Sequence, residues 1–196
     1  MKFPLDLCFK IIAIAPQATV TDANGDQVCY MKQKLLRLRE KVEIYTDSSR
    51  NTLAATITAN KVIDWSARYT FHDVDGNEIG SVGRRGMRSI WKAHYDVFNP
   101  GSEVPDFEIR EENPWAKVMD SVFGQIPILG FLTGFFFHPS YLATRKDGGG
   151  TIRLKKIPAF LEGKFTLTKL DSLTPREEMN LLLSYLMINL LERKRG

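Results

Sequence analysis

The C-terminal stretch of this chain begins as a helix and then stays apolar on every face. Thr174 suits the N-cap, Pro175 suits the first helical position, and Glu177 lies where a capping-box carboxylate reaches back to the cap amide. A helix that is apolar all round must be surrounded on all sides. The residues that make it so are Met179, Leu181, Leu182, Leu183, Tyr185, Leu186, Met187, Ile188, Leu190 and Leu191.

This helix is too short to be read as a membrane span. Residues 175–191 would extend roughly 25 Å at ~1.5 Å per residue, and their continuous apolar part is shorter than the ~20 residues that a span needs. Arg193, Lys194 and Arg195 follow at the negative end of the helix dipole. We therefore expect a buried central helix.

The remaining composition is that of an intracellular globular protein. In 196 residues, 27 Lys and Arg stand against 23 Asp and Glu, and this mild excess does not by itself indicate a nucleic-acid partner. Cys8 and Cys29 are isolated, which favours buried thiols in a reducing compartment. Asp6 and Lys10 interrupt the N-terminal apolar stretch, so we expect no signal peptide. The expected location is the cytoplasm, or peripherally the cytoplasmic face of a membrane.

Most of the chain has the pattern of short strands. Asn24-Gly25 and Asp75-Gly76 are signals for two-residue hairpins. Period-two alternation with β-branched and aromatic residues indicates eleven or twelve strands, which are enough to close into an antiparallel barrel around a helix. The fold class is therefore mainly β. The segments are 5–15, 28–36, 42–46, 53–59, 65–71, 79–84, 90–98, 107–110, 141–146, 151–157 and 164–170.

A second helical segment is expected near residues 114–137. Pro114 begins an amphipathic pattern that leads into the apolar run 126–137. Two interpretations stay open, a pair of short helices that cover one mouth of the barrel, or a shallow insertion at a membrane interface. The interface candidates are Ile128, Leu129, Phe131, Phe135, Phe136 and Phe137.

Several short motifs spread over nearly the whole chain carry a family resemblance. They are YMKQK at 30–34, YTF at 69–71, GSV at 80–82, GMRSIW at 86–91, NPW at 113–115, IPILG at 126–130, PSYL at 139–142 and PAFLEG at 158–163. With the apolar C-terminal helix, they resemble the tubby C-terminal-like superfamily, in particular the bacterial branch related to phospholipid scramblases and LURP-one-related proteins.

The resemblance implies one domain over residues 1–196, a roughly twelve-stranded barrel threaded by the C-terminal helix. Tubby domains are phosphoinositide-binding membrane tethers and scramblases are membrane-associated, so the resemblance implies a membrane role. No phosphoinositide-binding residue is carried over to this chain, because fold-level similarity is not a site.

Patterns for catalysis are missing from the sequence. His72, His94 and His138 have no metal-ligand spacing, and there is no GxSxG elbow. The carboxylates Glu103, Asp106, Glu108, Glu111 and Glu112 have the pattern of a solvated acidic face. We predict no catalytic residues, no metal site and no cofactor.

Two basic clusters are candidate sites for anions. Arg84, Arg85, Arg88 and Lys92 flank Trp91, and Arg153, Lys155 and Lys156 share a late strand. They form either the solvated outer face of strands or a patch that binds anionic lipid. Trp91 is the one aromatic beside these cations on which a base could stack, so we favour lipid over nucleic acid as the ligand of the clusters.

The leading hypothesis is a non-enzymatic module that binds anionic phospholipid or a membrane surface. The alternatives are a soluble module with a protein partner and an enzyme acting on a lipid-like ligand.

Overall fold

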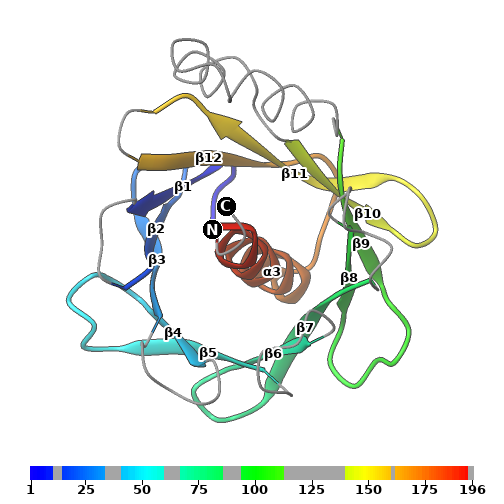
Figure 1. Cartoon of the computed structure of the whole chain (residues 1–196), viewed down its shortest axis with the longest axis horizontal. Helices are drawn as coiled ribbons and strands as arrows, with labels where there is room; N and C mark the ends of the chain where they lie inside the picture. The colour runs from blue at the N-terminus through cyan, green and yellow to red at the C-terminus, as the bar shows by residue number, and fades with distance from the viewer. Residues whose placement is uncertain are drawn as a thin grey trace, which may run out of the picture.

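The structure, a computed structural model, describes residues 1–10, 15–33, 41–59, 67–85, 94–112, 140–159 and 162–193. In these residues, twelve strands form one closed sheet with the C-terminal helix inside it (Figure 1). The elements are β1 (Leu5–Lys10), β2 (Gln17–Thr21), β3 (Gln27–Gln33), β4 (Lys41–Tyr45), β5 (Leu53–Ala59), β6 (Arg68–His72), β7 (Glu78–Arg84), β8 (His94–Phe98), β9 (Phe107–Glu111), β10 (Ser140–Arg145), β11 (Gly150–Ile157), β12 (Glu162–Lys169) and α3 (Pro175–Arg193).

Each strand pairs antiparallel with the next one in the chain, and β1 pairs with β12 to close the barrel. In the closing pair, Leu5 lies opposite Leu167 and Lys10 lies opposite Glu162. Closure removes the exposed edges that an open sheet of this size would carry. The prediction of a mainly β, closed antiparallel barrel around the C-terminal helix is confirmed.

Alternation along each strand separates the lumen from the outer face. On β8, Tyr95 and Val97 are buried in the core, whereas His94, Asp96 and Phe98 are only partly buried. Successive side chains of a strand point to opposite faces of the sheet, so the second set lies on the outer face. The outer face is therefore the place where polar residues of the strands come together.

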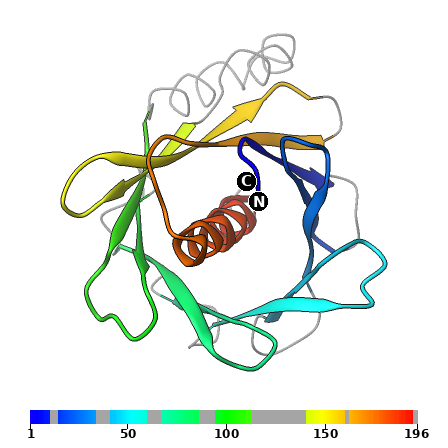
Figure 2. The same ribbon diagram turned by 180° about the vertical axis from the view of Figure 1, so that it is seen from behind.

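Helix α3 fills the lumen and is surrounded by strands in both views of the barrel (Figures 1 and 2). It packs most closely on β7, with further contacts to β6 and β8. The predicted buried central helix is confirmed, because eight of its ten large apolar side chains are at most 1% exposed, and Met179 and Leu191 are partly buried. The eight are Leu181, Leu182, Leu183, Tyr185, Leu186, Met187, Ile188 and Leu190.

The first turn of α3 is tied to the barrel rim. The Thr174 backbone N–H donates to Glu177 Oε2 at 2.8 Å and the Glu177 N–H donates to Thr174 Oγ1 at 3.3 Å, so the predicted capping box forms. Glu177 also pairs with Arg145 at the end of β10, at 2.7 Å. Glu178 pairs with Lys169 at the end of β12, at 2.8 Å. These contacts fix where the helix enters the lumen.

The structure differs from the predicted strands and turns in two places. The predicted strand 5–15 ends at Lys10, and Gln17–Thr21 forms β2, which the pattern of apolar residues did not indicate. The two hairpins turn where predicted, with Gly25 and Gly76 at φ of 84° and 86°. Their loops are longer than two residues, because an Asp side chain at the start of each accepts backbone N–H groups across the turn.

Other predictions concern the cysteines and the apolar segments. Cys29 is buried and Cys8 is half-buried, and both are free thiols.

The second helical segment near 114–137, with its interface candidates, lies outside the described residues, as do Arg88 and Lys92. In the described part of the chain, no helix is both long enough and apolar enough for a membrane span.

Candidate anion-binding surface

The end of β11 carries the predicted cluster Arg153, Lys155 and Lys156 along an open groove, which we call the β11–β12 groove. The register sets Arg153 opposite Thr168 and Lys155 opposite Thr166, on the outer face of the barrel. The groove has a volume of about 530 Å³. Its lining residues are Arg153, Lys155, Lys156, Ile157, Pro158, Thr166 and Thr168. The strand pairing thus brings cations and hydroxyl groups together.

Arg153 is the one cation of this groove whose charge is compensated by a carboxylate in the described structure. Its Nε and Nη2 donate to Glu112 Oε2 and Oε1, each at 2.9 Å, and the Ser140 hydroxyl also donates to Glu112. Burial on its own would raise the pKa of the Glu112 carboxyl, but the hydrogen bonds from Arg153 and Ser140 and the Arg153 charge hold that pKa below its ordinary value. Arg153 is therefore held at the edge of the groove.

Lys155 and Lys156 differ from Arg153 in their surroundings. Lys155 is exposed, Lys156 is half-buried, and neither makes an ion pair with any described residue. The next residue, Ile157, is a large hydrophobic side chain that is 38% exposed. Lys155 and Ile157 share the outer face, so an ammonium group there can bind an anionic group while the isoleucine contacts an apolar one, and Lys156 lines the same groove at the end of the strand.

A second, smaller groove of about 310 Å³ continues over β12, β1 and β2 and shares Ile157. Its Lys164 pairs with Glu162 at 3.3 Å, and the Thr166 hydroxyl donates to Asp6 at 2.9 Å. Burial, followed by the neighbouring Glu162 carboxylate, raises the pKa of the Cys8 thiol. A raised pKa disfavours the nucleophilic thiolate, and the paired lysine leaves this groove less attractive to anions than the first.

The other predicted basic cluster lies elsewhere on the barrel. Of its members, Arg84 and Arg85 are described, at the end of β7, which is separated from β11 by three strands in the sheet order. Arg85 donates to Glu108 at 2.8 Å and lies 3.7 Å from Asp96. The Arg84 guanidinium lies 6.0 Å from the centre of the Tyr95 ring. The described members of the two clusters do not form one surface, and Arg85 is charge-compensated.

The predicted solvated acidic face is only partly observed. Glu108 and Glu112 are the ion-pair partners of Arg85 and Arg153, and Glu111 is buried. Asp106 accepts the Asn99 backbone N–H at 2.8 Å and so closes the loop before β9. Glu108 and Glu112 hold the outer face together and are not free in solvent, because strand pairing places cations beside them.

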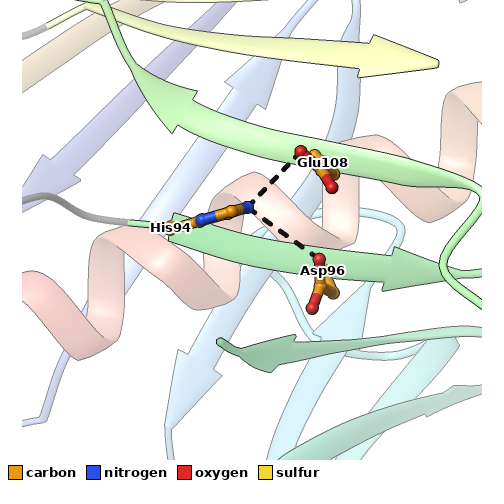
Figure 3. Close-up of side chains that lie close together, drawn as sticks. All are labelled: His94, Asp96 and Glu108. Atoms are coloured by element: carbon orange, nitrogen blue, oxygen red, sulfur yellow. Dashed lines mark ion pairs between the residues drawn. The ribbon is translucent and has the colours of Figure 1, made fainter. Parts of the chain in front are cut away.

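A third group on the outer face combines His94 and Asp96 of β8 with Glu108 of β9. His94 Nε2 lies 3.5 Å from Glu108 Oε2 and 4.0 Å from Asp96 Oδ1. Figure 3 shows the imidazole directed toward the space between the two carboxylates. Burial and then the Arg110 charge lower the pKa of His94, and burial raises the pKa of Asp96. At neutral pH the imidazole is therefore held in its neutral form.

No sequence pattern marked this group in advance. His94 and Asp96 share a face because they are two residues apart on a strand, which the sequence could have indicated. Glu108 joins them only through the register of β8 and β9, which sets it opposite Asp96. That register depends on the barrel as a whole.

The comparisons with known proteins identify a family. No curated protein matches the chain in sequence. Among solved structures, a porin-like protein from Bacteroides uniformis is similar with a TM-score of 0.24 and 10% sequence identity, over 85% of this chain and 95% of that chain. A similarity this low informs neither fold nor function. The family model of LURP-one-related proteins matches residues 27–128, slightly more than half of the chain. The chain therefore belongs to the LURP-one-related family, within the tubby-like and scramblase superfamily.

Proposed function

We propose that this protein is a non-enzymatic binding module that attaches peripherally to anionic phospholipid at the cytoplasmic face of a membrane, through the β11–β12 groove. The observation that carries this proposal is which cations of that groove form ion pairs and which do not. Lys155 and Lys156 make no ion pair with any described residue, and Thr168 lines the same space, whereas the hydroxyl of Thr166 already donates to Asp6. Ammonium and hydroxyl groups together suit a phosphate, which accepts hydrogen bonds from both.

Membership of the LURP-one-related family supports the non-enzymatic part of the proposal, because the tubby-like families are generally non-enzymatic. The described site residues agree with it. Burial and the Glu162 carboxylate raise the pKa of the Cys8 thiol, which disfavours the nucleophilic thiolate.

The expected strength of membrane binding follows from the number of available cations. A basic residue close to an anionic leaflet contributes about 1 kcal/mol, so two lysines contribute about 2 kcal/mol, or about 30-fold in partitioning. Ile157 adds apolar contact at the depth of the headgroups. The interaction should therefore be reversible and sensitive to salt.

Co-sedimentation with vesicles tests the proposal. The full chain is mixed with phosphatidylcholine vesicles, with and without phosphatidylserine or a phosphoinositide, over a series of salt concentrations. The test variant is Lys155→Gln with Lys156→Gln. The control, Lys146→Gln with Arg176→Gln, removes the same charge from two exposed residues at the rim where α3 begins.

Binding that requires anionic lipid and drops about 30-fold in the test variant, but not in the control, supports the proposal. An equal loss in both double variants would show that net charge and not the groove is responsible. No binding by the wild-type chain would reject the membrane role and favour a module with a protein partner. Binding of soluble inositol phosphates but not of vesicles would make a free phosphate the ligand.

A further inference from the structure

The group formed by His94, Asp96 and Glu108 has a geometry that the anion-binding proposal does not use. Its three ligand atoms, one nitrogen and two carboxylate oxygens, all lie within 4.8 Å of one another (Figure 3). All three side chains are held by adjacent strands, with Asp96 directly opposite Glu108 in the register. Rigid elements of this kind position ligands better than loops do.

We propose that His94, Asp96 and Glu108 form a binding site for a transition-metal dication of the Zn²⁺ type on the outer face of the barrel. Zinc binds imidazole nitrogen and carboxylate oxygen at ~2.0–2.2 Å, so tetrahedral ligands lie roughly 3.3–3.6 Å apart. The 3.5 Å between His94 Nε2 and Glu108 Oε2 already fits. The 4.0 Å between His94 Nε2 and Asp96 Oδ1 is longer than this range, so the Asp96 side chain has to move toward the imidazole when a metal binds.

Two of the three ligand atoms lack any other partner. His94 Nε2 and Asp96 Oδ1 have almost no accessible surface and accept or donate no hydrogen bond in the described structure. Polar atoms buried without a partner are rare and costly, so each one calls for an explanation. A cation between them would satisfy both atoms at once. A ligand site accounts for this geometry better than a group of ion pairs does.

Two neighbouring arginines, Arg85 and Arg110, contact the carboxylates of the group. Arg85 donates to Glu108 Oε1 and lies near Asp96 Oδ2, and Arg110 donates to Glu108 Oε2. They orient both carboxylates and leave Asp96 Oδ1 directed toward His94, as hydrogen-bonding groups outside a metal site commonly do. Because the carboxylate oxygens have further lone pairs, a guanidinium and a metal can share one carboxylate.

The same arginines determine which metal the group suits. Two arginines balance the charge of two carboxylates, so the site offers three metal ligands but carries little net negative charge. Ca²⁺ and Mg²⁺ depend on several oxygen ligands, whereas imidazole suits Zn²⁺, Cu²⁺ and Ni²⁺. We therefore expect Zn²⁺ to bind and Ca²⁺ and Mg²⁺ not to bind.

Calorimetric titration of the chelator-treated full chain with ZnCl₂ tests this site. We expect one Zn²⁺ per chain, with affinity reduced by about tenfold or more in His94→Gln and in Asp96→Asn. His72→Gln, another partly buried outer-face histidine, is the control and should leave binding unchanged. Cys8→Ser should also leave it unchanged, which separates this site from the half-buried thiol.

Imidazole resonances of the wild-type chain give a second readout that does not depend on variants. Zn²⁺ should shift the signals of His94 and leave those of His72 in place. Absence of Zn²⁺ binding, binding that survives both His94→Gln and Asp96→Asn, or equal binding of Ca²⁺ would each overturn the assignment.

Discussion

Asn180 of α3 lies so close to Gly80 of β7 that a Cβ on the glycine would come within 2.3 Å of the asparagine side chain. Asn180 is fully buried, and its Nδ2 donates to the Phe98 carbonyl at 3.0 Å. The close approach explains why α3 packs most closely on β7 among the strands that surround it. A glycine is needed at this point because the helix touches the sheet backbone itself.

Replacing this glycine should displace the helix. Gly80→Ala is expected to lower the free energy of unfolding by about 1 to 3 kcal/mol, because the added methyl group overlaps a buried side chain. Gly83→Ala on the same strand is the control, since its nearest atoms would be 3.9 Å away, and it should change stability by less than about 0.5 kcal/mol. Denaturant unfolding measures both. Equal losses of stability in the two variants would mean that the contact with Asn180 is not the reason why residue 80 must be a glycine.

The helix itself should be indispensable for folding. Leu186 is fully buried at the middle of α3, so Leu186→Asp places an unpaired charge in the lumen and should cost about 5 kcal/mol or more. Truncation after Asp171 should likewise leave a hollow barrel that does not fold. Arg176→Asp, on the exposed first turn of the same helix, is the control. A cooperative thermal transition of the truncated chain near that of the full chain would contradict this role.

Local patterns were sufficient to predict the barrel and its central helix. The helix has no polar face, so it can only be stable when it is enclosed, and Leu181 to Leu190 are enclosed as expected. β2 was missed because the apolar residues before Ala15 suggested one long strand. In Gln17–Thr21 only Ala18 and Val20 face the core, a signal too short to separate from its neighbour.

The ion pair at the start of α3 should make stability depend on pH. Burial on its own would raise the pKa of Glu177, but hydrogen bonds from the Thr174 backbone and from Arg145 lower it below its ordinary value of 4.5. Since the folded-state pKa lies below the unfolded one, the stabilisation is complete above about pH 4.5 and is lost as the pH falls through the folded-state pKa. The contribution should be about 1 to 2 kcal/mol.

Thermal unfolding of Glu177→Gln between pH 7 and pH 3 measures this contribution. The variant should be less stable than the wild-type chain at pH 7, and the difference should shrink toward pH 3. Glu103→Gln is the control, because it removes an exposed carboxylate that makes no ion pair in the described structure. Its difference in stability from the wild-type chain should not shrink toward pH 3. A constant difference across the pH range would mean that the Glu177 charge is not responsible.

The candidate site could be predicted from the sequence only in part. The cluster Arg153, Lys155 and Lys156 was visible because its members share one strand. That Arg153 is held by Glu112 was not visible, because the two residues are 41 positions apart and meet only because β10 pairs with both β9 and β11. The sequence shows which charges are present, and only the register shows which of them are compensated.

That compensation leads to a prediction in which a substitution strengthens binding. Glu112→Gln removes the carboxylate that neutralises Arg153 and leaves the guanidinium facing the β11–β12 groove. One additional cation near an anionic leaflet contributes about 1 kcal/mol, so partitioning onto phosphatidylserine vesicles should rise about fivefold. The increase should disappear at high salt, where the attraction between exposed charges is screened.

Glu108→Gln is the control for this experiment, because it removes the carboxylate that Arg85 and Arg110 share and leaves the groove as it is. If the groove is the membrane-contacting surface, only Glu112→Gln strengthens binding, and adding Lys155→Gln and Lys156→Gln to it returns binding to the wild-type level or below. If Glu108→Gln strengthens binding and Glu112→Gln does not, the contact surface is the one that carries Arg85 and Arg110 beside Glu108. Because the two variants remove the same charge from the chain, net charge cannot account for a difference between them.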